Sequence, residues 1–238
     1  MKILLIIPAY NEEESIINTI KEVENFRKNY EYDLDYIVIN DGSTDNTEQI
    51  LIKNKIKNIK LVINLGIGGA VQTGYKYAYK NQYDIAIQFD GDGQHDINSI
   101  DALIAPILAK QADLVVGSRF LKEKKATFQT TVMRKLGIKI ISFFIKIVAN
   151  LKIYDTTSGY RAANRKTLKI FSRRYPSKFP EPESIVVAKK KGLKIIEQPV
   201  NMFERQGGES SITPLKSISY MIEVCSTILI SILMKEND

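Results

Sequence analysis

The segment 89–95, with the sequence FDGDGQH, carries two carboxylates one residue apart, directly after an apolar run. Carboxylate and amide oxygens such as those of Asp90, Asp92 and Gln94 are hard ligands that suit Mg²⁺ or Mn²⁺. Such ions usually complete their shell with phosphate oxygens of a substrate. The segment therefore indicates a metal site for a diphosphate ligand, and the alternative is an ordinary surface turn, where Asp and Gly are also common.

His95 is the only histidine of the chain and lies within this acidic segment. An imidazole can orient a metal ligand or carry a proton. Because Asp92, Gln94 and Asp96 already supply oxygen ligands, we expect a structural or orienting role for His95 and leave it out of the catalytic set.

A chain of strands and helices must position these residues. Apolar runs rich in Ile and Val predict strands at 3–7, 36–39, 60–63, 85–89, 114–116 and 193–196. Segments of helical character lie between the early runs, at 12–26, 45–52, 69–79 and 98–109. The alternation predicts an α/β fold, with a mostly parallel sheet flanked by helices on both faces. Ligands of such folds bind at the carboxyl ends of the strands.

Turns with polar or glycine residues follow each of the first four predicted strands. They span 8–12, 41–45, 64–66 and the acidic segment. Taken singly, Asp45 is also explained as a helix N-cap and Gly66 as part of a tight turn. Four such turns in succession on one edge of one sheet favour a ligand site.

Composition limits the classes of partner. The 238 residues suit one large domain, and the net charge of +7 fits nucleic acid, an anionic membrane surface or a phosphorylated substrate. Nucleic acid is excluded as the expected partner, since no tract of interleaved aromatic and basic residues and no zinc-finger pattern occurs.

The single cysteine, Cys225, allows no intrachain disulfide and indicates a reducing compartment. The apolar run at 3–7 is too short for a signal peptide and is expected to form a buried strand.

Four strings of the first half resemble glycosyltransferase family 2, whose members have the GT-A fold. They are IPAYNE at 7–12, NDGSTDNT at 40–47, NLGIGGA at 64–70 and DGDGQH at 90–95. Within that family the chain is similar to polyprenyl-phosphate glycosyltransferases of the dolichyl-phosphate mannose synthase type. This second likeness rests on GSRF at 117–120 and DTTSGYR at 155–161.

The resemblance implies a set of roles. The catalytic residues would include Asp92, Asp155, Glu183 and Arg205. Mg²⁺ or Mn²⁺ would be held by Asp90, Asp92 and Gln94, and phosphates of the acceptor or donor would meet Arg119, Arg134 and Arg205. The nucleotide sugar would be bound by Pro8, Tyr10, Glu12, Asp41, Gly68, Asp90 and Gly91. The implied activity is metal-dependent, inverting transfer of a sugar from a nucleotide-diphosphate donor to a polyprenyl-phosphate or lipid-linked acceptor in cell-surface glycan assembly.

The acceptor is left open by two departures from the lipid-phosphate pattern. The segment 205–211 ends in a second serine where that type has a Ser-Lys pair, and PEPE at 180–183 is more similar to bacterial enzymes of polysaccharide assembly. A lipid phosphate is already anionic and needs little help from a base, whereas a sugar hydroxyl requires one. Asp155, Glu181 and Glu183 are the candidate bases, with Glu183 slightly preferred over Glu181. A non-catalytic nucleotide-sugar-binding subunit is the third alternative.

Two apolar segments predict contact with a membrane surface or a small membrane protein. In 131–153 the polar residues Lys135, Lys139, Ser142, Lys146 and Asn150 form one stripe of a helix, which suits a helix in the headgroup layer. The alternative is a core helix with solvated lysines. The segment 218–234 is too short and too polar for a convincing span. We therefore expect a GT-A domain over 1–212, a C-terminal docking helix within 213–238, and a cytoplasmic enzyme peripheral to the inner face of the cell membrane.

Overall fold

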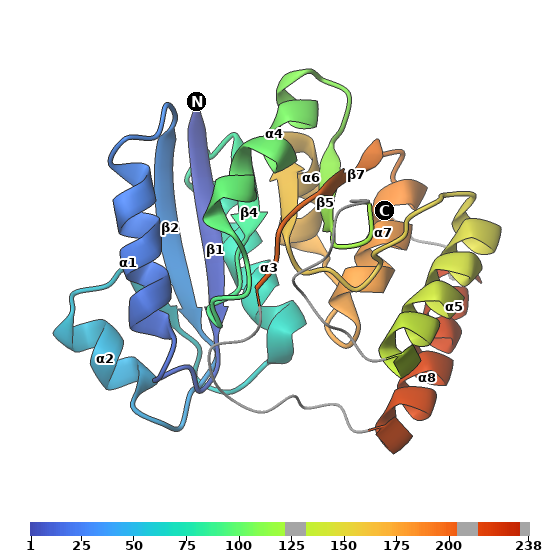
Figure 1. Ribbon diagram of the computed structural model, residues 1–238, viewed down its shortest axis with the longest axis horizontal. Helices are drawn as coiled ribbons and strands as arrows, with labels where there is room; N and C mark the ends of the chain where they lie inside the picture. The colour runs from blue at the N-terminus through green and yellow to red at the C-terminus, as the bar shows by residue number, and fades with distance from the viewer. Residues whose placement is uncertain (122–131, 204–213, 234–238) are drawn as a thin grey trace.

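The computed structural model describes residues 1–121, 132–203 and 214–233, with the backbone alone at 132–134, 214–220 and 231–233. Its centre is a seven-stranded sheet in the order β3-β2-β1-β4-β6-β5-β7 (Figure 1). The strands are β1 (Lys2–Ala9), β2 (Asp33–Asn40), β3 (Asn58–Lys60), β4 (Ile85–Gln88), β5 (Leu114–Ser118), β6 (Arg161–Asn164) and β7 (Ile195–Pro199). Strand β6 runs antiparallel to β4 and β5, whereas the other named pairs are parallel. The predicted mostly parallel sheet is therefore confirmed.

Helices cover both faces of this sheet, as expected. One face packs against α1 (Ile16–Arg27), the short 3₁₀ turn η1 (Ile97–Ser99) and α4 (Ile100–Leu108), with Leu51 of α2 (Thr47–Lys53) in the same cluster. The other face packs against α3 (Gly66–Lys80), α6 (Arg165–Arg173) and the end of α7 (Pro180–Lys190). The sheet is thus the middle layer of three.

Strand β1 shows why the apolar runs form central strands. Ile3, Leu5 and Ile7 point into one cluster, while Leu4 and Ile6 point into the other, and all five are fully buried. Successive side chains of a strand alternate between faces, so a strand covered on both faces must be apolar throughout. Burial of each such side chain contributes roughly 1.5–3 kcal/mol to folding.

The second half of the chain contains elements that the sequence patterns did not predict. Strand β6 has the sequence RAAN, without the Ile and Val of the other strands, and α6 and α7 follow it. The predicted strand 60–63 is displaced, because β3 ends at Lys60 and Val62 is 96% exposed. The polar turn that follows thus begins earlier than expected.

The predicted interfacial segment forms α5 (Val132–Ala149), and the C-terminal segment forms α8 (Pro214–Leu233). The two helices lie side by side (Figure 1) and pack with α7 around a third apolar cluster. Val224 and Ile228 of α8 meet Ile141 and Ile145 of α5 there. Within the described ranges, no helix combines the length and the hydropathy needed to cross a bilayer.

Candidate active site

The turn after β2 is hydrogen-bonded to the turn after β3, so two of the predicted ligand-binding turns are joined. Asp41 is buried, and its Oδ1 accepts a hydrogen bond from the Leu65 backbone N–H at 2.8 Å. Gly42 has a φ of +69°, and a Cβ there would lie 2.9 Å from backbone atoms of Ile63 and Asn64. Glycine is therefore required at this position. Burial raises the pKa of Asp41, although the backbone donors of Leu65 and Gly66 oppose the shift.

The turn after β1 is tied to the turn after β2. The Asn11 backbone N–H donates to Ser43 Oγ at 3.1 Å, and the Thr44 N–H donates to Asn11 Oδ1 at 2.8 Å. The Glu12 N–H donates to Thr47 Oγ1 at 2.9 Å. These bonds bring the predicted nucleotide residues to one edge, where Tyr10 is 45% exposed. An exposed aromatic ring beside a buried carboxylate suits a planar heterocyclic ligand.

Gly68 and Gly91 lie at close approaches of the backbone. A Cβ on Gly68 would come within 2.3 Å of the Pro176 carbonyl oxygen, and one on Gly91 would lie 3.1 Å from that of Pro8. Both glycines therefore have a packing role: Gly68 lets α3 meet the segment before α7, and Gly91 holds the acidic turn against the end of β1.

The acidic segment forms a tight turn directly after β4. The Gln94 backbone N–H donates to Asp92 Oδ1 at 3.0 Å, and Gln88 Nε2 donates to Asp90 Oδ1 at 3.3 Å. Asp90, Asp92 and Gln94 are all partly exposed, so a ligand can reach their oxygens. This turn is the part of the edge best suited to a cation.

A divalent cation fits this donor set, which offers two carboxylates and one amide oxygen. No cluster of three or more His, Cys, Asp or Glu side chains is arranged to hold a metal within the described part of the chain. Three side-chain oxygens leave coordination positions for phosphate oxygens and water, which Mg²⁺ commonly uses.

His95 is buried beneath this turn and fixed on several sides. Its ring stacks on Tyr160, with centroids 4.4 Å apart, and meets Phe89 edge-on. The Asp90 backbone N–H donates to Nδ1 at 3.0 Å, so the neutral ring carries its proton on Nε2, which lies 3.4 Å from Asp90 Oδ2. Burial lowers the pKa of His95 to about 4; the charge of Asp92 opposes the shift and that of Arg119 adds to it. These contacts are those of a neutral residue that orients Asp90.

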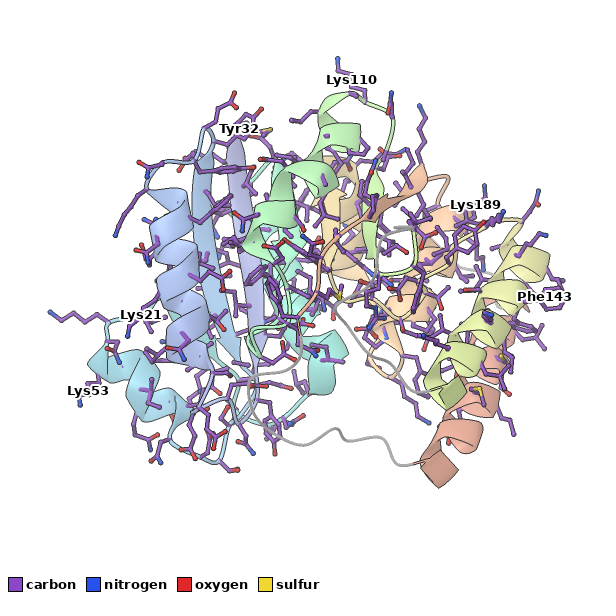
Figure 2. All side chains as sticks on the ribbon, viewed as in Figure 1. Lys21, Tyr32, Lys53, Lys110, Phe143 and Lys189 are labelled. Carbon is purple, nitrogen blue, oxygen red and sulfur yellow. The ribbon has the colours of Figure 1, made fainter. Side chains whose placement is uncertain are left out.

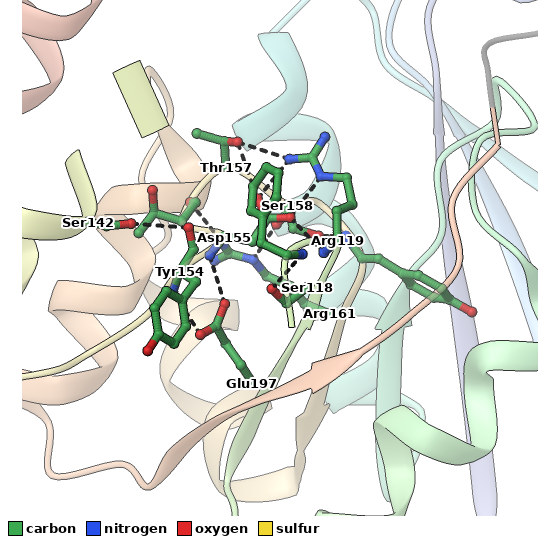
Figure 3. A network of polar contacts seen from close by, with 12 residues as sticks. Ser118, Arg119, Ser142, Tyr154, Asp155, Thr157, Ser158, Arg161 and Glu197 are labelled. Atoms are coloured by element: carbon green, nitrogen blue, oxygen red, sulfur yellow. Dashed lines mark hydrogen bonds and ion pairs between the residues drawn. The ribbon is translucent and has the colours of Figure 1, made fainter. Parts of the chain in front are cut away.

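Arg119 follows β5 and forms a buried ion pair with Asp155 (Figure 3). Its Nε and one terminal nitrogen each donate to a different carboxylate oxygen at 2.7 Å, and its backbone N–H adds a third bond at 3.0 Å. The same terminal nitrogen donates to Thr157 Oγ1 at 3.1 Å. Both oxygens of the fully buried Asp155 are thus occupied by Arg119, an arrangement that favours positioning of the guanidinium over general-base work by Asp155.

Glu197 supports this pair from β7. Its two carboxylate oxygens accept the backbone N–H groups of Tyr154 and Asp155, each at 2.7 Å (Figure 3). Burial raises the pKa of Glu197, while the two backbone donors oppose the shift. The sequence patterns gave no signal for Glu197, because it lies 42 positions from Asp155 inside a strand of ordinary polarity.

Arg161 fixes the loop that carries Asp155. The fully buried guanidinium donates to the Ser158 and Thr156 carbonyl oxygens at 2.7 and 3.2 Å and to Ser184 Oγ at 2.7 Å. The loop passes close to the acidic turn, since a Cβ on Gly159 would lie 3.1 Å from Asp90 Oδ2. The sequence singled out Arg161 only as part of the string DTTSGYR. The role of its guanidinium in fixing the loop could be recognised only in the folded structure.

The two glutamates of α7 have different surroundings. Burial raises the pKa of both carboxyls. Glu181 also experiences the opposing charge of Arg161 and the like charge of Asp90, whereas the charged neighbour of Glu183 is Lys178. Glu183 Oε1 is buried without a hydrogen-bond partner in the described structure. Of the two carboxyls, Glu181 is therefore the one that experiences the charge of the acidic turn, and the preference for Glu183 as a base stays a prediction.

The two remaining arginines are not placed. Arg134 belongs to the first turn of α5, but its side chain lies outside the described set, and Arg205 falls in the range 204–213, which is also outside it. Their predicted phosphate contacts, and the catalytic role of Arg205, stay predictions.

Comparison with solved structures defines the class of fold. The chain matches glucosyl-3-phosphoglycerate synthase from Mycobacterium tuberculosis, crystallised with Mn²⁺, UDP-glucose and phosphoglyceric acid, with a TM-score of 0.71 at 17% identity over 99% of this chain and 81% of that one. The fold is thus the GT-A fold of glycosyltransferases. The family model "Glycosyl transferase family 2" matches residues 4–171, and the chain therefore belongs to glycosyltransferase family 2.

Curated relatives include transferases that act on polyprenyl phosphates. A UDP-N-acetylglucosamine–dolichyl-phosphate N-acetylglucosaminyltransferase from Methanococcus voltae is 36% identical over 217 residues, covering 83% of this chain and 84% of the relative. An undecaprenyl-phosphate mannosyltransferase from Micrococcus luteus is 28% identical over 224 residues, covering 90% and 88%. The predicted resemblance is confirmed, and the protein is a glycosyltransferase whose relatives include polyprenyl-phosphate sugar transferases.

Proposed function

We propose that the protein is a metal-dependent, inverting transferase that moves a sugar from a nucleoside-diphosphate donor to a polyprenyl phosphate. The observation that carries the proposal is the position of Arg119. Its guanidinium is held by Asp155, whose loop passes close to Asp90, and its charge acts on His95 beneath the acidic turn. A guanidinium binds phosphate oxygens well, and the relatives named above act on phosphate acceptors.

The chain provides different groups for the two substrates. Tyr10, Glu12 and Asp41 would hold the nucleoside, and Asp90, Asp92 and Gln94 would hold Mg²⁺ or Mn²⁺ with the diphosphate. When bound, the ion would offset the negative charge that develops on the leaving nucleoside diphosphate. His95 lies beneath Asp90 and would orient this ligand of the ion.

The reaction needs no general base if the acceptor is a phosphate. An anionic phosphate oxygen attacks the anomeric carbon from the face opposite the diphosphate, the bond from that carbon to the diphosphate oxygen breaks, and the nucleoside diphosphate leaves with the electron pair. Configuration is inverted because one displacement occurs. Asp155 then serves to position Arg119, which is consistent with both of its oxygens being occupied.

Transfer to a sugar hydroxyl is the second candidate, and Glu181 is the observation in its favour. This carboxyl lies in the field of Asp90, and burial raises its pKa, which is the direction that strengthens a carboxylate as a base. Under this alternative, Glu181 would accept the hydroxyl proton.

A binding measurement followed by a transfer measurement tests the proposal. We expect one of UDP, GDP, dTDP and CDP to raise the melting temperature of the protein only when Mn²⁺ is present, because a ligand of the folded state stabilises it. The matching nucleotide sugar should then label a polyprenyl phosphate. Glu181→Gln should leave this transfer within about twofold. Labelling of a sugar acceptor in place of the polyprenyl phosphate, with a hundredfold loss in Glu181→Gln that is within the range for an absent general base, would favour the hydroxyl acceptor. The absence of any nucleotide shift would favour a non-catalytic subunit.

The proposed location is the cytoplasmic side of the cell membrane, with peripheral attachment. A polyprenyl phosphate presents its headgroup at the bilayer surface, so an enzyme that uses it must reach that surface.

A further inference from the structure

Helices α5 and α8 carry a row of exposed apolar side chains that the fold leaves uncovered. On α5, the row is Leu136, Ile140, Phe143 and Ile147, which are 50%, 42%, 64% and 63% exposed. These positions are spaced by four, three and four residues and so lie along one side of the helix. Phe143 points away from the rest of the molecule in Figure 2.

This row is separate from the side of α5 that is buried in the protein. Ile138, Ile141 and Ile145 are buried, and Ile141 and Ile145 belong to the cluster shared with α7 and α8. At 100° per residue, the exposed row lies roughly opposite these positions. The core of the protein therefore does not account for the apolar character of the outer side, and the expectation of a core helix with solvated lysines explains only half of α5.

Helix α8 extends the uncovered surface. It buries Val224 and Ile228 against its neighbours but leaves Ile222 and Leu229 at 63% and 45% exposure. We call these two residues and the four of the α5 row the outer face. A face of six large apolar side chains on a pair of adjacent helices is typical of an interaction surface.

The charges beside the outer face indicate an anionic partner. Three lysines of α5 are exposed, and each immediately precedes a residue of the apolar row: Lys135, Lys139 and Lys146. Helix α5 contains no Asp or Glu. The exposed acid of the described part of α8, Glu223, pairs with Lys178 at 2.7 Å. A basic stripe next to an apolar row fits a helix lying at an anionic lipid surface.

The position of the outer face also suits that partner. Helices α5 and α8 both begin at the end of the molecule where β1 and β4 finish, which is the edge that holds the acidic turn (Figure 1). A bilayer lying along the outer face would therefore reach the end of the molecule where the active-site edge lies.

We propose that the outer face of α5 and α8 docks the protein onto an anionic lipid bilayer, with the apolar row inserted and the three lysines at the headgroups. The inference rests on the proposed function, because that function requires the acceptor to be met at a bilayer surface. It commits to lipid and not to a second copy of the chain, since the lysine stripe would face an identical positive stripe in a symmetric dimer made by this face.

Sedimentation with vesicles tests the docking directly. Wild-type protein should bind vesicles of 7:3 phosphatidylcholine and phosphatidylglycerol, and bind pure phosphatidylcholine vesicles about tenfold more weakly. The double variant Phe143→Ser, Ile147→Ser should lose tenfold or more of the binding to the mixed vesicles. Ile52→Ser is the matched control, because Ile52 is 65% exposed on α2, far from α5. Lys135→Gln, Lys139→Gln and Lys146→Gln together should remove the preference for the anionic lipid.

Several results would overturn the proposal. Equal vesicle binding by the wild type and the Phe143, Ile147 variant would exclude the outer face as the lipid contact. A wild-type dimer in sedimentation velocity that becomes monomeric in this variant would assign the face to a second copy.

Transfer to a short, water-soluble isoprenyl phosphate separates the docking from the proposed function. We expect the Phe143, Ile147 variant to keep wild-type turnover with this acceptor and to lose turnover with polyprenyl phosphate in vesicles. Equal loss with both acceptors would contradict a docking role. Absence of any transfer by the wild type, with vesicle binding intact, would refute the proposed function and leave the docking in place.

Discussion

The two sides of the proposed active site, the donor edge where β1, β2 and β4 end and the acceptor side around Arg119 and Asp155, handle charge in opposite ways. At the edge formed by β1, β2 and β4, the carboxylates of Asp90 and Asp92 are partly exposed and held mainly by turn hydrogen bonds. On the β5 side, Arg119 and Asp155 are buried and bonded to each other at three points. The difference fits the proposal that the donor edge receives its positive charge from a bound ion, whereas the acceptor side has a guanidinium of its own, held by Asp155.

Asp92→Asn should break the donor side and have the largest effect on activity. We expect turnover to fall by roughly 10²–10³-fold, the loss typical of one removed electrostatic contact at the reacting charge. The melting temperature should stay nearly unchanged, because Asn keeps an acceptor for the Gln94 N–H. Transfer assays and thermal unfolding measure the two quantities. Asp33→Asn, an exposed substitution at the opposite end of β2, is the control, and near-normal turnover of Asp92→Asn would remove the metal hypothesis.

Asp155→Asn should disrupt the acceptor side, and its main effect should be a lower free energy of unfolding. It leaves a buried guanidinium without its counter-charge, which costs about 3–5 kcal/mol in other buried pairs and corresponds to a drop in melting temperature of roughly 6–20 °C for a chain of this size. Chemical denaturation measures the free energy of unfolding. Glu48→Gln, which removes one partner of an exposed pair with Lys60, should cost less than about 1 kcal/mol. Similar losses in the two variants would contradict the contrast between the two sides.

His95 offers a finer test of the donor side. Replacement by Gln retains an N–H group near the position of Nε2, and replacement by Asn retains an acceptor near Nδ1. If the proton facing Asp90 orients the metal ligand, His95→Gln should keep most of the Mn²⁺ affinity and His95→Asn should lose about 10–100-fold. Electron paramagnetic resonance of Mn²⁺ in the presence of the nucleoside diphosphate measures this affinity without turnover. Equal affinities in both variants would indicate a packing role alone.

Glu183→Gln should give the smallest effect and one that depends on pH. Burial raises the folded-state pKa of Glu183 above 4.5, so the unfolded chain ionises first and the carboxyl lowers stability as pH rises through that range. Removing the charge should therefore raise the melting temperature at pH 7 and leave it unchanged near pH 4. Activity should remain, since the charge that acts on Glu183 is that of Lys178 and not that of Asp90. Exposed Glu31→Gln should show no such pH dependence, and the same profile in both variants would contradict the assignment.

The donor edge was predictable because its elements are local. Strands β1, β2 and β4 each contain an apolar run that ends in a polar turn, so Asp41 and Asp90 could be assigned to one edge from order alone. The family strings then added roles that spacing does not provide.

The acceptor side was less predictable because its contacts are distant in sequence and its strand has no pattern. Strand β6 is buried on both faces, where Ala162 and Ala163 leave room for larger neighbouring side chains. Two alanines do not form the run of Ile and Val residues by which the other strands were predicted. The bonds of Arg119 to Asp155, and of Glu197 to the same loop, span 36 and 42 positions. The choice between Glu181 and Glu183 likewise depends on which charges the fold brings near each carboxyl, and the sequence does not determine these.

The antiparallel strand β6 has a consequence for how the chain assembles during synthesis. Strand β4 ends at Gln88, but the strand that completes its hydrogen bonding begins at Arg161. A ribosome adding 5–20 residues per second needs roughly 4–15 s to make the intervening stretch of about 70 residues. For that interval one edge of the nascent four-stranded sheet is open, so the window for misfolding or chaperone binding closes only when β6 emerges.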